Sequence, residues 1–185
     1  MIRLLSLIGL SGTLIGLAIH FMTFRSKPSV PIGPVVSIHN LLRGILRKLI
    51  YFLMLLCFVV LIITGFYPFL ILDVPLSSYF LVLHLTFAPI FAVLLSIFIL
   101  ISAHYHRFTG SDWRWREKTE LGLKSCFWLM ILFSIPLILS IILSMYPIMG
   151  TQYQEFLRDV HRLSALLFVM ITLIHTYLIA LPSHR

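Results

Sequence analysis

The sequence has little charge and few acidic residues. Only 11% of its 185 residues are charged and only six are Asp or Glu, whereas 60% are hydrophobic, and the mean hydropathy is +1.05. This composition excludes an ordinary soluble domain and is typical of a polytopic membrane protein. Spans and short connectors account for nearly the whole chain, so we expect an all-α membrane protein without a separate soluble domain.

Cysteine is also scarce. Cys57 and Cys126 lie in or beside different apolar stretches, and neither belongs to a CxxC or CxxCH motif. Nothing therefore indicates a disulfide framework, a zinc site or covalent c-type haem. By contrast, eight histidines are an excess for so small a membrane chain.

Five apolar stretches predict five membrane-spanning helices. They cover about residues 1–24, 49–70, 77–103, 125–147 and 159–182. Residues 1–24 form a longer apolar stretch than the core of a signal peptide and show no small-residue cleavage site, so we expect a retained, additional N-terminal transmembrane helix. A basic cytoplasmic connector, residues 25–48, then leads to a four-helix membrane domain over residues 49–182, and turns helical again around His39.

The basic residues predict the orientation. Five Lys or Arg residues lie in connector 25–48, five in connector 104–124 and one at Arg185, whereas the other three are Arg3, Arg158 and Arg162. Five spans place these two sets on opposite sides, so the N-terminus is predicted outside and the C-terminus in the cytoplasm. Because the basic residues flank apolar spans, topology explains the net charge of +8 better than nucleic-acid binding does.

Two histidines lie in the last apolar stretch, His161 and His175. Ionisable residues inside a membrane span are costly and are usually functional. Their spacing places the two rings about 40° apart around a helix and about 21 Å apart along it. One helix could thus carry two haems, one near each leaflet; the alternative is two unrelated polar residues.

His84 is the predicted partner of His161. Both lie a short way inside the membrane from the outer side, on different helices, so they could supply both axial ligands of an outer haem. The alternative for His84 is a polar residue that packs against a neighbouring helix.

Helix spacing leaves four histidines to compare as the inner partner of His175. A helix continued from His84 places His104 about 200° round and about 30 Å further along, on the wrong face. His106 returns to the right face but lies deeper still among basic residues, which favours a solvated interfacial position for both, and His39 is also expected in water. His20 fits the depth best, so we predict it as the partner of His175.

Several motifs resemble the cytochrome b (gamma) subunit of membrane-bound respiratory formate dehydrogenases, whose relatives serve nickel-iron hydrogenases and thiosulfate reductases. The matching stretches, over about residues 45–182, read TGFYPFL, HLTFAPIFA followed by HYH and SDWRW, GLKSCFW, and HRLSALLFVMITLIHTYLIAL. The resemblance implies a four-helix transmembrane cytochrome b bundle with two b haems. It pairs His84 with His161 at the outer haem and places His175 at the inner haem, near a quinone site.

What the resemblance implies for function is electron transfer between an outer iron-sulfur or cytochrome subunit and the quinone pool of a bacterial or archaeal cytoplasmic membrane. Apart from a quinone site, we expect no substrate catalysis by this chain.

Arg158 and Arg162 either pair with outer haem propionates or anchor the helix at the interface. His104, His106, Asp112 or Glu117 could aid cytoplasmic proton exchange.

One position departs from the resemblance. The family's second inner ligand matches Tyr51, and tyrosine is a poor substitute for imidazole on a low-spin haem. Either His20 on the added helix replaces that ligand, or the inner haem is lost or differently ligated. The alternative function is therefore a single-haem or haem-free membrane anchor that docks a peripheral redox subunit.

Overall fold

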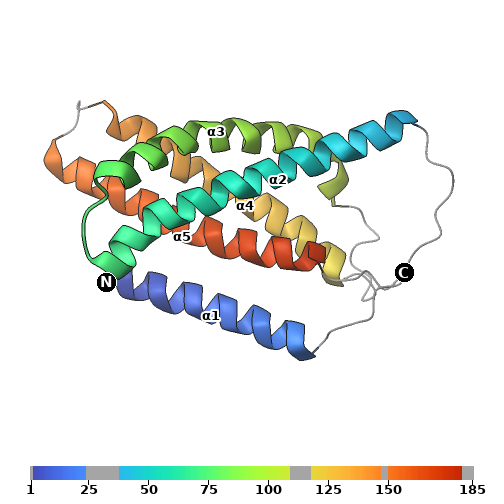
Figure 1. Ribbon diagram of the computed structural model, residues 1–185, viewed down its shortest axis with the longest axis horizontal. Coiled ribbons are helices and arrows are strands. Elements are labelled where there is room, and N and C mark those ends of the chain that lie inside the picture. The colour runs from blue at the N-terminus through green and yellow to red at the C-terminus, as the bar shows by residue number, and fades with distance from the viewer. Residues whose placement is uncertain (1, 24–37, 109–117, 147–149, 181–185) are drawn as a thin grey trace. The chain divides into compact units, whose positions relative to one another are not determined.

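A computed structural model describes residues 2–23, 38–108, 118–146 and 150–180 of the chain. Over these ranges the protein is helical and contains no strand. The five α-helices are α1 (Ile2–Thr23), α2 (Ile38–Tyr67), α3 (Ser78–Ser102), α4 (Lys118–Ser144) and α5 (Thr151–Ala180), as Figure 1 shows. A π-helical turn, η1 (Pro68–Leu72), extends α2, and a 3₁₀ turn, η2 (Ala103–His106), extends α3.

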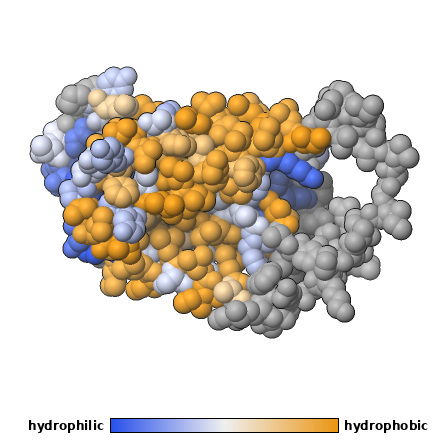
Figure 2. Space-filling view, in the orientation of Figure 1, coloured by the Kyte–Doolittle hydropathy of each residue, from blue (hydrophilic) through white to orange (hydrophobic). Residues whose placement is uncertain are grey.

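Four helical segments are long and apolar enough to cross a membrane. They are Lys48–Leu72, Ser78–His106, Leu121–Ser144 and Thr151–Ile179. Large apolar side chains are exposed along all four, and on the face shown in Figure 2 they cover the middle of the helices. Such surfaces are stable in lipid rather than water, so these helices indicate a membrane protein. The all-helical class is confirmed, and four of the predicted spans coincide with helices long and apolar enough to cross a membrane.

Helix α1 is present, but its role as a span is not established. The helix has 22 residues, and its apolar part among the described side chains, Ser6–Ala18, is shorter than a membrane span. Its crossing of the membrane stays a prediction. Within the predicted connector 25–48, α2 already begins at Ile38, as the expected helical turn around His39 requires. Asp112 and Glu117 lie outside the described residues.

Helices α2 and α3 form one compact unit, residues 30–105. They run antiparallel (Figure 1) and meet through aromatic rings, with Phe58 stacked on Phe91 at 5.9 Å between ring centroids. Two helical turns away, the Tyr51 ring lies 5.4 Å from that of Phe98. Aromatic pairs at this distance contribute packing beyond simple burial. They hold α3, and with it His84, against α2.

Helices α1, α4 and α5 form the second unit, residues 1–29 and 106–185. Figure 1 shows α4 antiparallel and α1 parallel to α5. Helices α4 and α5 meet where Gly122 lies beside Leu178 and where the Thr172 hydroxyl donates to the Met130 sulfur at 3.4 Å. Small and polar residues at such contacts let helix backbones approach closely where water is absent.

Candidate functional site

His84 on α3 is held through its Nδ1 nitrogen. The Thr64 hydroxyl on α2 lies 3.0 Å from this nitrogen and also donates to the Val60 carbonyl at 2.8 Å. A hydroxyl has one proton to donate, so when Thr64 donates to Val60 its oxygen accepts from His84, and Nδ1 then carries the hydrogen. In that tautomer the lone pair of the neutral imidazole is on Nε2, the nitrogen with which a histidine can bind a metal.

Gly65, the residue after Thr64, makes room for the His84 ring. A Cβ atom built at Gly65 would lie 3.1 Å from Cε1 and 3.5 Å from Nδ1 of His84. The first distance is shorter than an ordinary van der Waals contact, so any other residue would displace the ring. The Thr-Gly pair of the TGFYPFL motif thus has a local role: Thr64 hydrogen-bonds the imidazole, and Gly65 leaves space for the ring.

His161 on α5 is also held through its Nδ1 nitrogen, by residues of α4. Its Nδ1 lies 3.1 Å from the carbonyl oxygen of Leu137 on α4 and 3.4 Å from the Ser140 hydroxyl, which itself donates to that carbonyl at 3.0 Å. A carbonyl oxygen only accepts hydrogen bonds, so Nδ1 is the protonated nitrogen and Nε2 holds the lone pair. His84 has the same tautomer when Thr64 donates to its own helix.

His175 is one of the most buried side chains described, with 1% of its surface exposed. Its ring centroid lies 6.1 Å from that of His106, and the ring planes are inclined by 42°. His106 in turn stacks on Phe127 of α4 at 4.1 Å and 13°. The Trp128 indole N–H donates to the His106 carbonyl at 2.9 Å, so α4 contacts both the ring and the backbone of His106.

This placement corrects the expectation that His106 is a solvated interfacial residue remote from His175. The expectation assumed that the α-helix of the third span continues through residue 106. Instead the chain tightens into the 3₁₀ turn η2 after Ser102, and a 3₁₀ helix advances with a different angle and rise per residue. The ring of His106 is then half-buried against α4 and within reach of His175 on α5.

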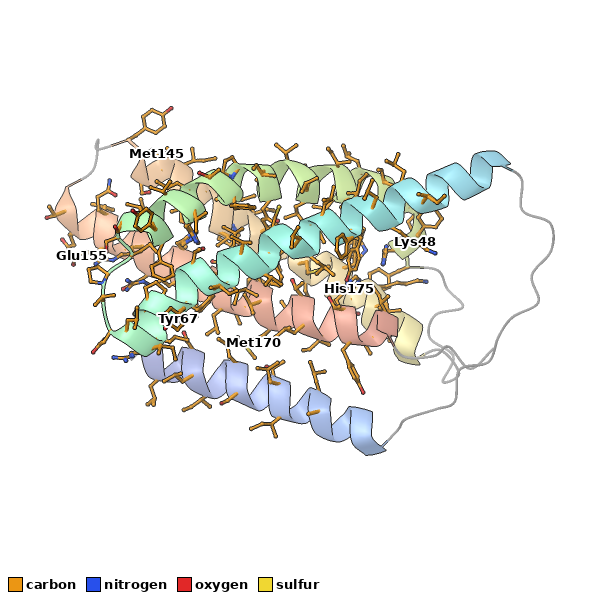
Figure 3. All side chains as sticks on the ribbon, viewed as in Figure 1. Lys48, Tyr67, Met145, Glu155, Met170 and His175 are labelled. Carbon is orange, nitrogen blue, oxygen red and sulfur yellow. The ribbon has the colours of Figure 1, made fainter. Side chains whose placement is uncertain are left out.

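Helix α1 packs against a different side of α5. Gly9 of α1 approaches Met170 and Leu166, and Ile174 lines the same α1–α5 groove; Figure 3 shows Met170 on the side of α5 that α1 covers. His175 is about 140° round the helix from the middle of that face. The side chains of His20 and His39 lie outside the described residues, so the pairing of His20 with His175 stays a prediction, one that this face does not favour.

The remaining predicted residues lie at the surface. Arg158 is exposed, and an Arg162 guanidinium nitrogen lies 3.8 Å from an Asp159 carboxylate oxygen. The pairing of these arginines with propionates stays a prediction. His104 is exposed, with its ring edge-on to Tyr105 at 5.8 Å.

Among the described residues, no three His, Cys, Asp or Glu side chains gather as a metal site. A bis-histidine haem needs only two protein ligands, so this finding does not bear on the predicted haems. No family model, curated protein or solved structure matches the chain. The likeness of its motifs to the cytochrome b subunits stays a prediction.

Proposed function

We propose that this chain is a membrane-embedded b-type cytochrome subunit of a respiratory redox complex. It would transfer electrons between an outer-side iron-sulfur or cytochrome subunit and the quinone pool of a bacterial or archaeal cytoplasmic membrane. The proposal includes a four-helix cytochrome b bundle made by α2 to α5, with α1 as an additional fifth span. It rests above all on the Nδ1 hydrogen bonds that hold both His84 and His161.

These bonds matter because metal-binding histidines almost always donate their other ring N–H to a carboxylate, a backbone carbonyl or water. That bond fixes the ring's orientation and makes the ligating nitrogen more basic. His84 is held in this way by Thr64, and His161 by Leu137 and Ser140. The proposal therefore requires His84 and His161 to ligate one iron, the outer haem.

The chain's own residues would bind and insulate the redox group. A haem bound there supplies one-electron transfer. His84 and His161 would hold the haem iron between them, and the apolar helices would exclude water, so the site would offer no open position to a substrate. Arg158 and Arg162, next to His161 on α5, would offset the charge of propionates at the outer end. A quinone would bind near His175 at the inner end.

A count of haems tests the proposal. Purified protein should contain about two b haems per chain in a pyridine haemochrome assay, both low-spin. His84→Ala and His161→Ala should each remove one haem, and the double variant should lose no more than either single variant. The matched control is His104→Ala, which replaces an exposed histidine on the same polypeptide segment as α3 and should retain both haems.

The proposal fails if the wild-type chain, produced with ample haem, contains none. The outer pairing fails if the double variant loses two haems where each single variant loses one, because His84 and His161 would then serve different irons.

A single-haem anchor is the second candidate, and Tyr51 favours it. The resemblance places the second inner ligand at the position of Tyr51. The Tyr51 ring packs against Phe98 of α3, which is a structural role. If no other imidazole replaces it, only the outer haem would be present. The wild-type count, one haem rather than two, separates this candidate from the first.

A further inference from the structure

We propose that His106, not His20, is the second axial ligand of the inner haem iron, opposite His175. This inference rests on the proposed cytochrome function and assigns one of its two sites. It adds a ligand from the η2 turn, whose histidines the helix spacing predicts to be solvated.

The separation of the two rings suits a shared iron. A first-row metal lies roughly 2 Å from an imidazole nitrogen, and the ring centre lies about 1 Å beyond it, so two axial imidazoles have centres roughly 6 Å apart. The His106 and His175 centroids are 6.1 Å apart. The inclination of 42° between their planes is no obstacle, because axial imidazoles can rotate about their bonds to the metal.

His106 is positioned more firmly than a histidine in a connector usually is. Its ring stacks on Phe127, which is itself 1% exposed, so the stacking surface cannot move aside easily. The neighbouring residue, Trp128, bonds the His106 backbone carbonyl. Consecutive residues of α4 therefore fix the ring and the main chain separately, as a ligand held in place before the metal binds requires.

The other candidates are less well placed. His20 belongs to α1, and α1 lies against the face of α5 formed by Leu166, Met170 and Ile174, about 140° from His175. His104 precedes His106 by two residues but is exposed and has its ring against Tyr105.

Methionine substitution provides the sharpest test. In His106→Met, one of the two haems should change from bis-histidine to histidine–methionine ligation. This change would appear as a sulfur-to-iron charge-transfer band in the ferric spectrum and a more positive midpoint potential for that haem alone. His20→Met and His104→Met are matched controls and should keep two bis-histidine haems, judged by the electron paramagnetic resonance spectrum.

His106→Ala gives a second readout if methionine does not ligate. The inner haem should become high-spin or be lost, and added imidazole should restore its low-spin spectrum, which a merely structural role of His106 would not predict.

Each outcome bears on one proposal. A wild-type chain without haem overturns the cytochrome function itself. A wild-type chain with only the haem removed by His161→Ala overturns this inference and leaves a single-haem cytochrome. Two wild-type haems that keep bis-histidine spectra in both His106 variants also overturn it, and a change in His20→Met instead would assign the ligand to α1.

Discussion

At the scale of single residues, the Thr64 hydroxyl and the absence of a side chain at Gly65 hold the His84 ring in position. Thr64 donates to a carbonyl of its own helix, as Thr and Ser commonly do in membrane helices, and this leaves its oxygen as an acceptor for the imidazole. Gly65 leaves the space that the ring fills. Neither residue would ligate a metal, yet together they determine which nitrogen can.

Thr64→Val tests this role, because valine keeps the shape of threonine and removes its hydroxyl. Without the acceptor, the His84 tautomer is no longer fixed, and loss of such a supporting hydrogen bond typically weakens metal binding by roughly 10- to 100-fold. We expect faster loss of the outer haem to an apo-globin acceptor. Thr86→Val is the control: Thr86 also donates to its own helix but is exposed. Equal haem-loss rates in the two variants would contradict the role of Thr64.

Gly65→Ala should disturb the same ring by steric contact. The added methyl would lie 3.1 Å from His84 Cε1, so the imidazole must shift by a few tenths of an ångström. We expect altered g values for the outer haem in electron paramagnetic resonance, with the inner haem unchanged. Gly12→Ala on α1 is the control, since no atom lies within 4 Å of a Cβ at that position. An unchanged spectrum in Gly65→Ala would show that the ring has room to spare.

The residue-level predictions succeeded where helix periodicity applies. The spacing of His161 and His175 required only that α5 be one continuous helix, and it is. The hydrogen bonds to Thr64, Leu137 and Ser140 could not be predicted, because they depend on how two helices are rotated against each other. The position of His106 was missed because a change from α to 3₁₀ geometry leaves no clear mark in the sequence.

At the scale of helices, α1 meets α5 through small residues. Gly9, Gly12, Thr13 and Gly16 line one side of an open groove of about 460 Å³, and Met170 and Ile174 line the other. Their spacing of three or four residues places them on one helix face. Small residues at this spacing let helices approach closely in membranes, where burial of apolar surface provides little drive for association.

Cysteine cross-linking tests the contact between α1 and α5. In a chain with Cys57→Ala and Cys126→Ala, the pair Gly9→Cys and Met170→Cys should form a disulfide readily in membranes, because a Cβ at Gly9 lies 3.2 Å from the Met170 sulfur. The control pair, Ser11→Cys with Met170→Cys, starts from an exposed residue of α1 and should link poorly. Mass spectrometry of the linked peptides gives both yields. Equal yields would show that α1 does not keep this face toward α5.

Helix bounds were predicted well only where they coincide with the edge of apolar sequence. α5 begins at Thr151, eight residues before the predicted start at Asp159, because its first turns are polar. Hydropathy marks the part of a helix that suits lipid, and it cannot show how far the helix continues into water. For the same reason α2 begins well before its apolar span, at Ile38.

At the scale of the whole molecule, α1 decides the topology. Four spans alone would place the start of α2 and the C-terminus on the same side of the membrane, and the basic connectors predict that this side is the cytoplasm. If α1 also crosses, the N-terminus lies outside. If it lies along the membrane or on another protein surface, the N-terminus stays with the basic connectors.

Labelling of single cysteines with a membrane-impermeant maleimide distinguishes the two arrangements. With native cysteines replaced, Ile2→Cys should react in intact cells, as should Gly150→Cys in the predicted outer loop before α5, where a Cβ has open space. Phe108→Cys, at an exposed position after η2, should react only after the membrane is made permeable. Ile2→Cys that behaves like Phe108→Cys would rule out a crossing by α1. The proposed electron path requires the haem site near His175 to lie at the cytoplasmic end of the spans. Labelling of Phe108→Cys in intact cells would place that end outside and would contradict the path.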